Sequence, residues 1–527
     1  MADTKTASKG SLKRELGLWA LVALGVGAII GSGIFVLPAI MGGVAGPSFI
    51  VAVVLVGIIV LILGLAYAEL GSAYPMTGGP YSLPRKAMGN DTGFVLGFGY
   101  FIYAFTGTAA IIDVFITYLG YYVPGLVINS VLTPLGIGLA LICIGIFTII
   151  NILGLKFGSE YAILTTLGKI IPLALFVIIG FMFFNATNFS PFAIAGFGGI
   201  ELAMALDFFA FTGFESVVVP EGEVKNPGRN IPRAMVLSIL IVVAVYVAIS
   251  VAFTGMFNWG AAGLNVGDWT SGIAGLSSPL ATAGASVGLP ILAAIVVIGA
   301  IISTAGCGGD WILLQARIPY AMAKNKLFWS KLDDVNSKFG TPAKALIFAS
   351  VLTGITMVLL PTFPSVALIA SITTLVPYAC AALALPILRK TDPKAKRPFK
   401  LPFAMFFAVA GFVLCTLLIY WASWPWTLVG CILMLVAYPL FLVFKEDKTI
   451  ELKRNLWLMV YLVGIVAISL LGDPTFTYNN FLPIGPMGVL TSPYDAIVVV
   501  VFSLIIFVWG YLSNVKHEPL EDDLDNE

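Results

Sequence analysis

The feature that most restricts how this chain folds is a long series of apolar runs, each long enough to cross a lipid bilayer. About fourteen such runs follow one another, near residues 17–44, 48–74, 94–122, 131–152, 158–184, 198–220, 233–257, 288–321, 343–361, 365–388, 402–421, 425–444, 456–472 and 494–513. A helix crosses the bilayer core with about 20 apolar residues. Hydrophobic residues make up 59% of the chain and charged residues only 10%, which excludes the soluble globular class. The sequence therefore predicts an all-α polytopic membrane protein.

Basic residues are distributed unevenly around these runs. When the connecting segments are assigned alternately to two sides, all but one of the 28 lysine and arginine residues fall on the side that carries both chain ends. Cytoplasmic loops of membrane proteins carry an excess of lysine and arginine. We therefore expect a multi-pass protein of the cell membrane with both termini in the cytoplasm.

The exception is Lys169, which lies about ten residues into the fifth apolar run. That distance is roughly 15 Å along a helix, so its ammonium group reaches the membrane surface only with difficulty. Ionisable groups at membrane depth are costly and are usually functional. We interpret Lys169 as functional; a lysine that only snorkels to the surface is the alternative.

Acidic residues also occur inside the runs, at Glu69, Asp113, Asp207, Glu215 and Asp310. Glu69 and Asp310 lie toward the cytoplasmic ends of their runs and are interpreted as structural partners of loop residues. Asp113 and Asp207 lie closer to the outer side.

The sequence shows no pattern for covalent chemistry. His517 is the only histidine, which excludes a catalytic triad and a histidine-based metal site. No Walker-type loop and no cysteine–histidine cluster occurs, and the five cysteines all lie in apolar runs. We therefore expect no enzyme activity, no cofactor, no metal and no nucleic-acid partner.

The first apolar run is interrupted at its centre. Gly31, Ser32 and Gly33 stand where a continuous helix favours alanine or leucine. Backbone that leaves the helix at membrane depth is tolerated only where it lines an enclosed cavity. The free N–H groups at the start of the second half-helix carry the positive end of its dipole and suit a carboxylate. The alternative is a small-residue packing face of the GxxxG kind.

The sixth run contains a second interruption. Gly213 lies between Thr212 and Glu215, which places a polar, flexible step at membrane depth. Interrupted helices at corresponding places of two five-helix halves are typical of inverted-repeat transporters. The two breaks together therefore favour a ligand site over simple helix packing.

Four motifs carry a resemblance to a known family. They are GSGIF at 31–35, AELGSAYPMTGGPY at 68–81, FFAFTGFESVVVPEGEVKNPGRNIPRA at 208–234 and ARIPYAMAKNKLFW at 316–329. Over residues 16–444 the chain resembles the amino acid–polyamine–organocation superfamily, and the last motif is similar to a helix end followed by an amphipathic cytoplasmic segment. The resemblance implies a LeuT-type fold with inverted repeats at 17–184 and 198–388, two spans at 389–444 and two additional spans at 445–513. Residues 1–16 and an acidic segment at 514–527 are then cytoplasmic tails.

The resemblance also implies roles for particular residues. The turn at Gly31–Gly33 matches the receiver of a substrate carboxylate, and the carbonyl-rich turn after Phe209 matches the receiver of its amino group, with Phe209 as an aromatic gate. The implied substrate-binding residues are Ile30, Gly31, Ser32, Gly33, Phe209, Ala210, Phe211, Thr212 and Gly213. The implied proton-coupling residues are Lys169, Glu215, Ser303 and Thr304, with the backbone at 28–30 and the two hydroxyls as the neighbours of Lys169.

The predicted function is secondary active transport of an amino acid by alternating access, coupled to protons through Lys169. An amino acid exchanger and a polyamine transporter are the alternatives, and a non-transporting amino acid sensor is a more distant one. The apolar surroundings of Phe209 favour a neutral or bulky apolar substrate. The expected partners are the amino acid, the proton and the lipid bilayer, and the sequence makes no prediction of the oligomeric state.

Overall fold

The computed structural model describes residues 16–74, 81–154, 159–218, 224–444, 451–475 and 477–520. Several expectations lie outside the described residues. These are the basic segment before residue 16, Lys156, Lys445 and Lys448, most of the acidic C-terminal segment, and the parts of two family motifs at 75–80 and 219–223.

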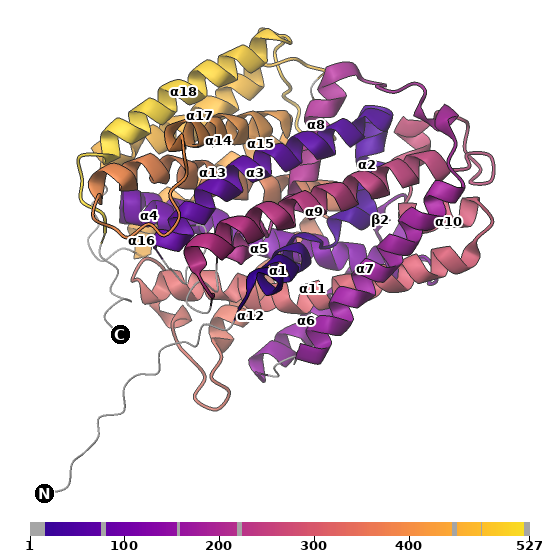
Figure 1. Cartoon of the computed structure of the whole chain (residues 1–527), viewed down its shortest axis with the longest axis horizontal. Helices are drawn as coiled ribbons and strands as arrows, with labels where there is room; N and C mark the ends of the chain where they lie inside the picture. Colours follow the sequence, from indigo (N-terminus) through magenta and orange to yellow (C-terminus); the bar gives the residue numbers. More distant parts are fainter. Residues whose placement is uncertain are drawn as a thin grey trace, which may run out of the picture.

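The described chain is almost entirely helical (Figure 1). Its first helices are α1 (Leu18–Ile29), α2 (Gly33–Ala45), α3 (Phe49–Ala73), α4 (Ser82–Met88), α5 (Asn90–Leu119), α6 (Pro134–Ile152) and α7 (Ser159–Met182). Then follow α8 (Gly196–Phe211), α9 (Pro227–Met256), α10 (Pro279–Ser286), α11 (Pro290–Lys324), α12 (Ala343–Leu359) and α13 (Phe363–Thr391). The last are α14 (Ala404–Trp421), α15 (Trp426–Leu435), α16 (Ala437–Phe444), α17 (Leu452–Leu471) and α18 (Tyr494–Asn514).

Short elements connect these helices. They are η1 (Gly46–Ser48), η3 (Ala186–Phe189), η4 (Phe214–Val217), η6 (Trp269–Ile273), η7 (Ser330–Leu332) and the antiparallel strands β1 (Val127–Ile128) and β2 (Val131–Leu132). At one end of the bundle lie α4 and α16, and at the other end lie α10 and β2 (Figure 1).

Each predicted apolar run coincides with one helix or one pair of helices. Within the described residues, twelve helical segments are long and apolar enough to cross a membrane, one of them the joined segment Gly33–Ala73, and α1 and α12 are shorter apolar helices. The expectation of an all-α polytopic membrane protein is therefore confirmed. Two runs each contain two helices: the first run holds α1 and α2, and the twelfth holds α15 and α16.

Proline at the first helical position defines several helix starts. Pro134, Pro227 and Pro290 open α6, α9 and α11, where the missing N–H group removes no helical hydrogen bond. Thr133 also caps α6, because its hydroxyl accepts a hydrogen bond from the N–H of Gly136 at 3.2 Å. The helix α9 thus begins before residue 233, where its apolar pattern starts.

The segment at 316–329 contains the end of a helix. Helix α11 continues through its first nine residues and ends at Lys324. Its last turns are held by packing on α5, where a Cβ atom added to Gly97 would lie 3.0 Å from the Met322 sulfur. Burial of Ile318 and Met322 therefore extends the helix through Pro319.

The helices form two groups, defined by which helices pack on one another. In the first group, α1, α3 and α8 pack on α9 or on one another, and α2 packs on α8. In the second group, α5, α6 and α12 pack on α11. Close approach within the first group depends on small residues: a Cβ atom added to Gly57 on α3 would lie 2.3 Å from Val243 on α9.

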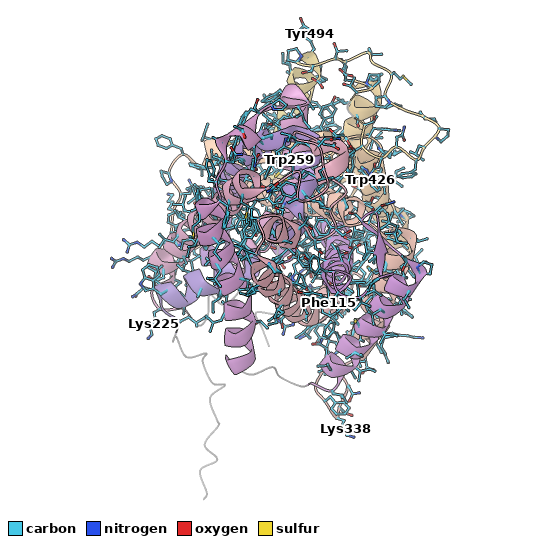
Figure 2. The ribbon with its side chains drawn as sticks, turned by 90° about the vertical axis from the view of Figure 1, so that its right-hand side faces the viewer. Phe115, Lys225, Trp259, Lys338, Trp426 and Tyr494 are labelled. Carbon is cyan, nitrogen blue, oxygen red and sulfur yellow. The ribbon has the colours of Figure 1, made fainter. Side chains whose placement is uncertain are left out.

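The helix α13 lies between these groups and the C-terminal helices. It packs on α5, α8 and α14 and is buried along its whole apolar length. Helices α17 and α18 pack on each other and on α14 and α15. Viewed from the end that carries α10, Tyr494 at the start of α18 and Lys338 before α12 lie at opposite edges of the bundle (Figure 2).

The end of the bundle that carries α4, which we call the basic end, holds Arg85 and Lys86 of α4 itself. Arg454 also lies there, since it donates to the Ala87 carbonyl group. Arg389 donates to both carboxylate oxygens of Glu69, at 2.8 Å from Nε and 2.5 Å from Nη2. The N–H group of Leu401 donates to the same carboxylate at 2.7 Å. Arg454 on α17 donates to Asn514 on α18 at 2.9 Å. Glu69 is therefore a structural partner of the last turn of α13 and of the loop that follows it.

Replacement of Glu69 by alanine is expected to lower the free energy of unfolding by about 3–5 kcal/mol, because it leaves Arg389 without its buried partner. The control is Lys344→Ala, which breaks an ion pair with Asp334 whose side chains are both 56% exposed; such pairs contribute below about 1 kcal/mol. The measurement is the temperature at which detergent-solubilised protein loses its monodisperse chromatographic peak. Equal shifts in the two variants would contradict the assignment.

Candidate functional site

The first predicted break is present between α1 and α2. Helix α1 ends at Ile29, the N–H group of Ile30 closes it on Val26 at 2.9 Å, and α2 begins at Gly33. Within the described part of the chain, the N–H groups of Gly31, Ser32 and Gly33 have no hydrogen-bond acceptor. The Ser32 hydroxyl is also buried without a partner. The start of α2 thus presents free donors inside the protein, at the positive end of a helix dipole.

The two glycines of this break have different surroundings. A Cβ atom on Gly31 would meet only the Ile29 carbonyl oxygen, at 3.9 Å, so Gly31 borders open space. A Cβ atom on Gly33 would lie 3.0 Å from the Cβ atom of Ala210 on α8. Neither glycine has a positive φ. At Gly33 steric room, and not backbone conformation, is therefore the reason for glycine, whereas no described atom crowds a side chain at Gly31.

The second predicted break lies between α8 and η4. Helix α8 ends at Phe211, and the Thr212 hydroxyl donates to the Phe209 carbonyl at 2.7 Å. Gly213 has φ +96°, a conformation that favours glycine. A Cβ atom there would lie 2.8 Å from the Ala28 carbonyl oxygen of α1. The two breaks therefore lie directly against each other.

Lys169 on α7 contacts the first break. Its ammonium group donates to the carbonyl oxygens of Gly27 and Ile30, both at 3.0 Å, and lies 3.8 Å from the Cys307 sulfur on α11. The last carbonyl groups of a helix have no intrahelical partner and carry the negative end of its dipole. Lys169 therefore satisfies the broken end of α1 by hydrogen bonds and by charge.

The expected hydroxyl neighbours of Lys169 have other environments. The Thr304 hydroxyl donates to Ala300 within α11 at 2.6 Å, and the Ser303 hydroxyl is buried without a partner. Cys307 contacts Lys169 instead, because it lies one turn further along the same helix. Asp310 on α11 is within electrostatic reach of Lys169.

Tyr246 on α9 joins the two breaks and is a residue that sequence reasoning missed. Its hydroxyl lies 3.2 Å from the Ile29 carbonyl oxygen and 3.0 Å from the Ala210 carbonyl oxygen, with donor geometry toward both. It therefore bridges the last turns of α1 and α8. In the sequence Tyr246 stands in an apolar run among valines, where nothing distinguishes it from packing bulk.

Glu215 follows the second break and is surrounded by tyrosines that sequence reasoning also missed. Tyr100 on α5 donates to one of its carboxylate oxygens at 3.0 Å. Tyr67 on α3, Tyr103 on α5 and Tyr378 on α13 are buried within electrostatic reach of the same carboxylate. These residues come from three helices far apart in the sequence, so only the fold brings them together.

Phe209 packs away from the other aromatic residues of α8. Its ring meets Phe363 edge to face, with ring centroids 5.5 Å apart. Phe208 packs on Tyr378 and Phe211 packs on Tyr246. Phe363 lines a pocket of about 570 Å³. The Phe209–Phe363 pair therefore lies between this pocket and the second break.

These features define a class of protein. Two interrupted helices whose free ends face each other within a polytopic bundle are the ligand site of a secondary transporter. A family model described as amino acid permease matches residues 16–468. The chain belongs to this amino acid permease family, for which the LeuT fold is expected, and it is a multi-pass membrane protein of amino acid transport.

Three relatives from Bacillus subtilis (strain 168) are similar to this chain. A glutamate/serine transporter is 28% identical over 97% of this chain and 96% of its own length. An aspartate-proton symporter is 28% identical over 98% of this chain and 100% of its own length. A serine/threonine exchanger is 33% identical over 77% of this chain and 92% of its own length.

Replacement of Gly33 by valine is expected to abolish amino acid binding, because the side chain pushes α2 away from Ala210. Overpacking of this kind costs about 1–3 kcal/mol. Gly31→Ala is expected to keep thermal stability, since its methyl group enters open space and meets no crowded neighbour. It is expected to weaken binding, because the methyl group takes part of the space that the ligand would occupy. The matched control is Gly27→Ala, whose added Cβ atom meets nothing within 4 Å. The measurement is ligand-induced thermal stabilisation with a panel of amino acids, and wild-type stabilisation of Gly33→Val would refute the assignment.

Proposed function

We propose that this protein is a proton-coupled secondary active transporter of amino acids that works by alternating access. The observation that carries the proposal is the Lys169 ammonium group bound to the Gly27 and Ile30 carbonyls at the break in α1. It joins an ionisable group at membrane depth to the element that would hold the substrate.

The proposed substrate site lies between the two breaks. The free N–H groups of residues 31–33 would bind the substrate carboxylate. The carbonyl groups of Phe209, Ala210 and Thr212 would accept hydrogen bonds from its ammonium group. Ile30, Phe211 and Gly213 complete the two turns, and Gly31 leaves the room that the ligand needs.

The packing of the helices supports alternating access. The group of α1, α3, α8 and α9 is held together by close contacts, as is the group of α5, α6, α11 and α12. We assign the first five spans to a repeat at 17–184 and the next five to a repeat at 198–388. Movement of the first group against the second would open the substrate site to each side of the membrane in turn.

Lys169 would couple this movement to protons. Charged, it binds two carbonyl oxygens of α1 by charge-assisted hydrogen bonds, which are stronger than neutral ones. Neutral, it loses that advantage and releases α1. Movement of α1 would make or break these two hydrogen bonds, which links the ammonium group to the conformation of the break. The similar aspartate-proton symporter supports this coupling.

Exchange is the second candidate function, and the similar serine/threonine exchanger favours it. In that case a second amino acid, and not a proton, returns the carrier. Uptake into proteoliposomes distinguishes the two functions. Proton coupling requires a pH gradient for concentrative uptake, whereas exchange requires an amino acid preloaded inside the vesicles.

The apolar surroundings of Phe209 predicted a substrate with a neutral or bulky apolar side chain. The tyrosines around Glu215 favour a polar side chain instead. The hydroxyls of Tyr67, Tyr103 and Tyr378 lie close to the second break and favour a polar side chain. Two of the similar relatives are named for glutamate, serine or aspartate. Small polar amino acids are therefore the first substrates to test. We place the protein in the cell membrane with its basic end in the cytoplasm, following the distribution of its basic residues.

Replacement of Lys169 by alanine is expected to abolish uptake driven by a pH gradient while binding remains measurable, and sodium is expected to have no effect. The reason is that the variant keeps both breaks but loses the ionisable group that responds to the proton. The control is Cys307→Ala, which removes only the contact at 3.8 Å. Uptake is measured in proteoliposomes and binding by thermal stabilisation. Loss of binding and stability together would assign Lys169 a purely structural role.

Replacement of Phe209 by alanine is expected to weaken binding by about 1–3 kcal/mol, the usual contribution of an aromatic ring that covers a ligand. Phe209→Trp is expected to be tolerated better, since it keeps a ring against Phe363. The matched control is Phe208→Ala, because Phe208 packs on Tyr378 instead. If Phe208→Ala is the more damaging change for affinity, the gate is assigned to the wrong residue.

A further inference from the structure

The pocket beside Phe363 is separate from the two helix breaks described above. Its volume is about 570 Å³, and it is lined by residues of α2, α5, the segment around η6 and the connection between α17 and α18. We call this pocket the vestibule. Its polar lining residues are Asp113, Thr117, Ser130, Thr270, Ser277, Thr477, Tyr478 and Asn479. Among the described residues that line it, Asp113 is the only aspartate, glutamate, lysine, arginine or histidine.

Asp113 on α5 is buried and only half satisfied. Its side chain is 3% exposed. One carboxylate oxygen accepts a hydrogen bond from the Thr117 hydroxyl at 3.1 Å, and the other has no partner among the described residues. No basic side chain occurs among the described residues that line the vestibule, and Lys169 is bound to the end of α1. A buried carboxylate without a partner costs free energy, so its presence beside a pocket indicates a ligand.

We propose that Asp113 forms an entry site for protonated primary amines, at which the α-ammonium group of an amino acid binds before it passes Phe209. The inference rests on the proposed function for the direction of passage, but the binding site itself is separate from the two breaks. The free carboxylate oxygen would accept a charge-assisted hydrogen bond from the ammonium group. Thr117 holds the carboxylate in place through its other oxygen.

The chemistry of the lining favours an amine over a metal ion. A metal site needs several anionic or imidazole ligands, and no group of three such residues occurs among the described residues. A single carboxylate suffices for an ammonium group. The remaining polar lining is made of hydroxyl and amide groups, which can donate hydrogen bonds to a substrate carboxylate without a fixed positive charge.

The connection between α17 and α18 supplies one wall of the vestibule. Two tryptophans at the start of α15 hold it: Trp426 donates from its indole to the Tyr478 carbonyl at 2.9 Å, and the Tyr478 N–H group donates to the Trp424 carbonyl at 3.1 Å. Thr477 and Asn479 on either side line the pocket. The two additional spans therefore give the entry site a boundary that the first twelve spans alone do not supply.

The test uses the full chain in lipid nanodiscs, with Ser277→Cys as a reporter in the vestibule wall. Labelling at position 277 is followed by peptide mass spectrometry, so that the native cysteines do not interfere. Two thiol reagents are compared, a trimethylammonium-ethyl and a sulfonato-ethyl methanethiosulfonate. Each rate is divided by the rate of the same reagent with a free thiol in solution. On this scale the cationic reagent is expected to react several-fold faster, and Asp113→Asn is expected to remove the difference. Asp113→Glu, which keeps the charge, is expected to retain it. Equal rates with Asp113 intact would overturn the proposal.

The ligand class is tested by protection of the same reporter with three millimolar probes. Serine and serinamide carry the ammonium group and are expected to slow labelling, whereas N-acetylserine lacks it and is expected to have no effect. The same pattern is expected with Gly33→Val, in which the central site is disabled. Protection that disappears with Gly33→Val would assign the effect to the central site, which overturns this inference and leaves the proposed function intact. Protection by N-acetylserine equal to that by serine would also overturn it.

Discussion

The structure of the site depends on one interaction, the contact between the Lys169 ammonium group and the broken end of α1. A helix that stops in the middle of a membrane leaves carbonyl groups that water cannot reach. Lys169 satisfies two of these groups, at Gly27 and Ile30, and Tyr246 lies within hydrogen-bond distance of a third, at Ile29. The same contact gives the buried ammonium group its partners. Each side of the interaction therefore lowers the energetic cost of the other.

This dependence links the first break to two other helices and to the second break. Lys169 belongs to α7, Tyr246 to α9, and Gly213, which leaves room for the Ala28 carbonyl group, to the second break. Any displacement of α1 changes all of these contacts together. Helices α1 and α9 belong to the first packing group, whereas α7 also packs on α11 of the second. The site is therefore built where the two groups meet, and its hydrogen bonds respond to their relative position.

A path from the vestibule to the breaks follows from the aromatic packing. Phe363 lines the vestibule and contacts Phe209, which precedes the second break by one turn. An amino acid held in the vestibule would thus face an aromatic pair before it reached the free N–H groups of residues 31–33. The connection between α17 and α18 closes one side of this path through its contacts with Trp424 and Trp426. In the proposed path, the connection between the two additional spans would take part in substrate entry.

The sequence by itself determined the membrane class, the order of the apolar helices, the two breaks and the presence of one lysine at membrane depth, because apolar length, glycine interruptions and an isolated charge are properties of contiguous residues. It did not determine which side chains complete the site. Tyr246 and the tyrosines around Glu215 look like packing residues in their own runs, and Cys307, not Ser303 or Thr304, contacts Lys169. The vestibule likewise joins Asp113 to a segment more than three hundred residues away. Only the tertiary structure decided these neighbours, because their partners come from helices that the chain order separates and that packing alone brings together.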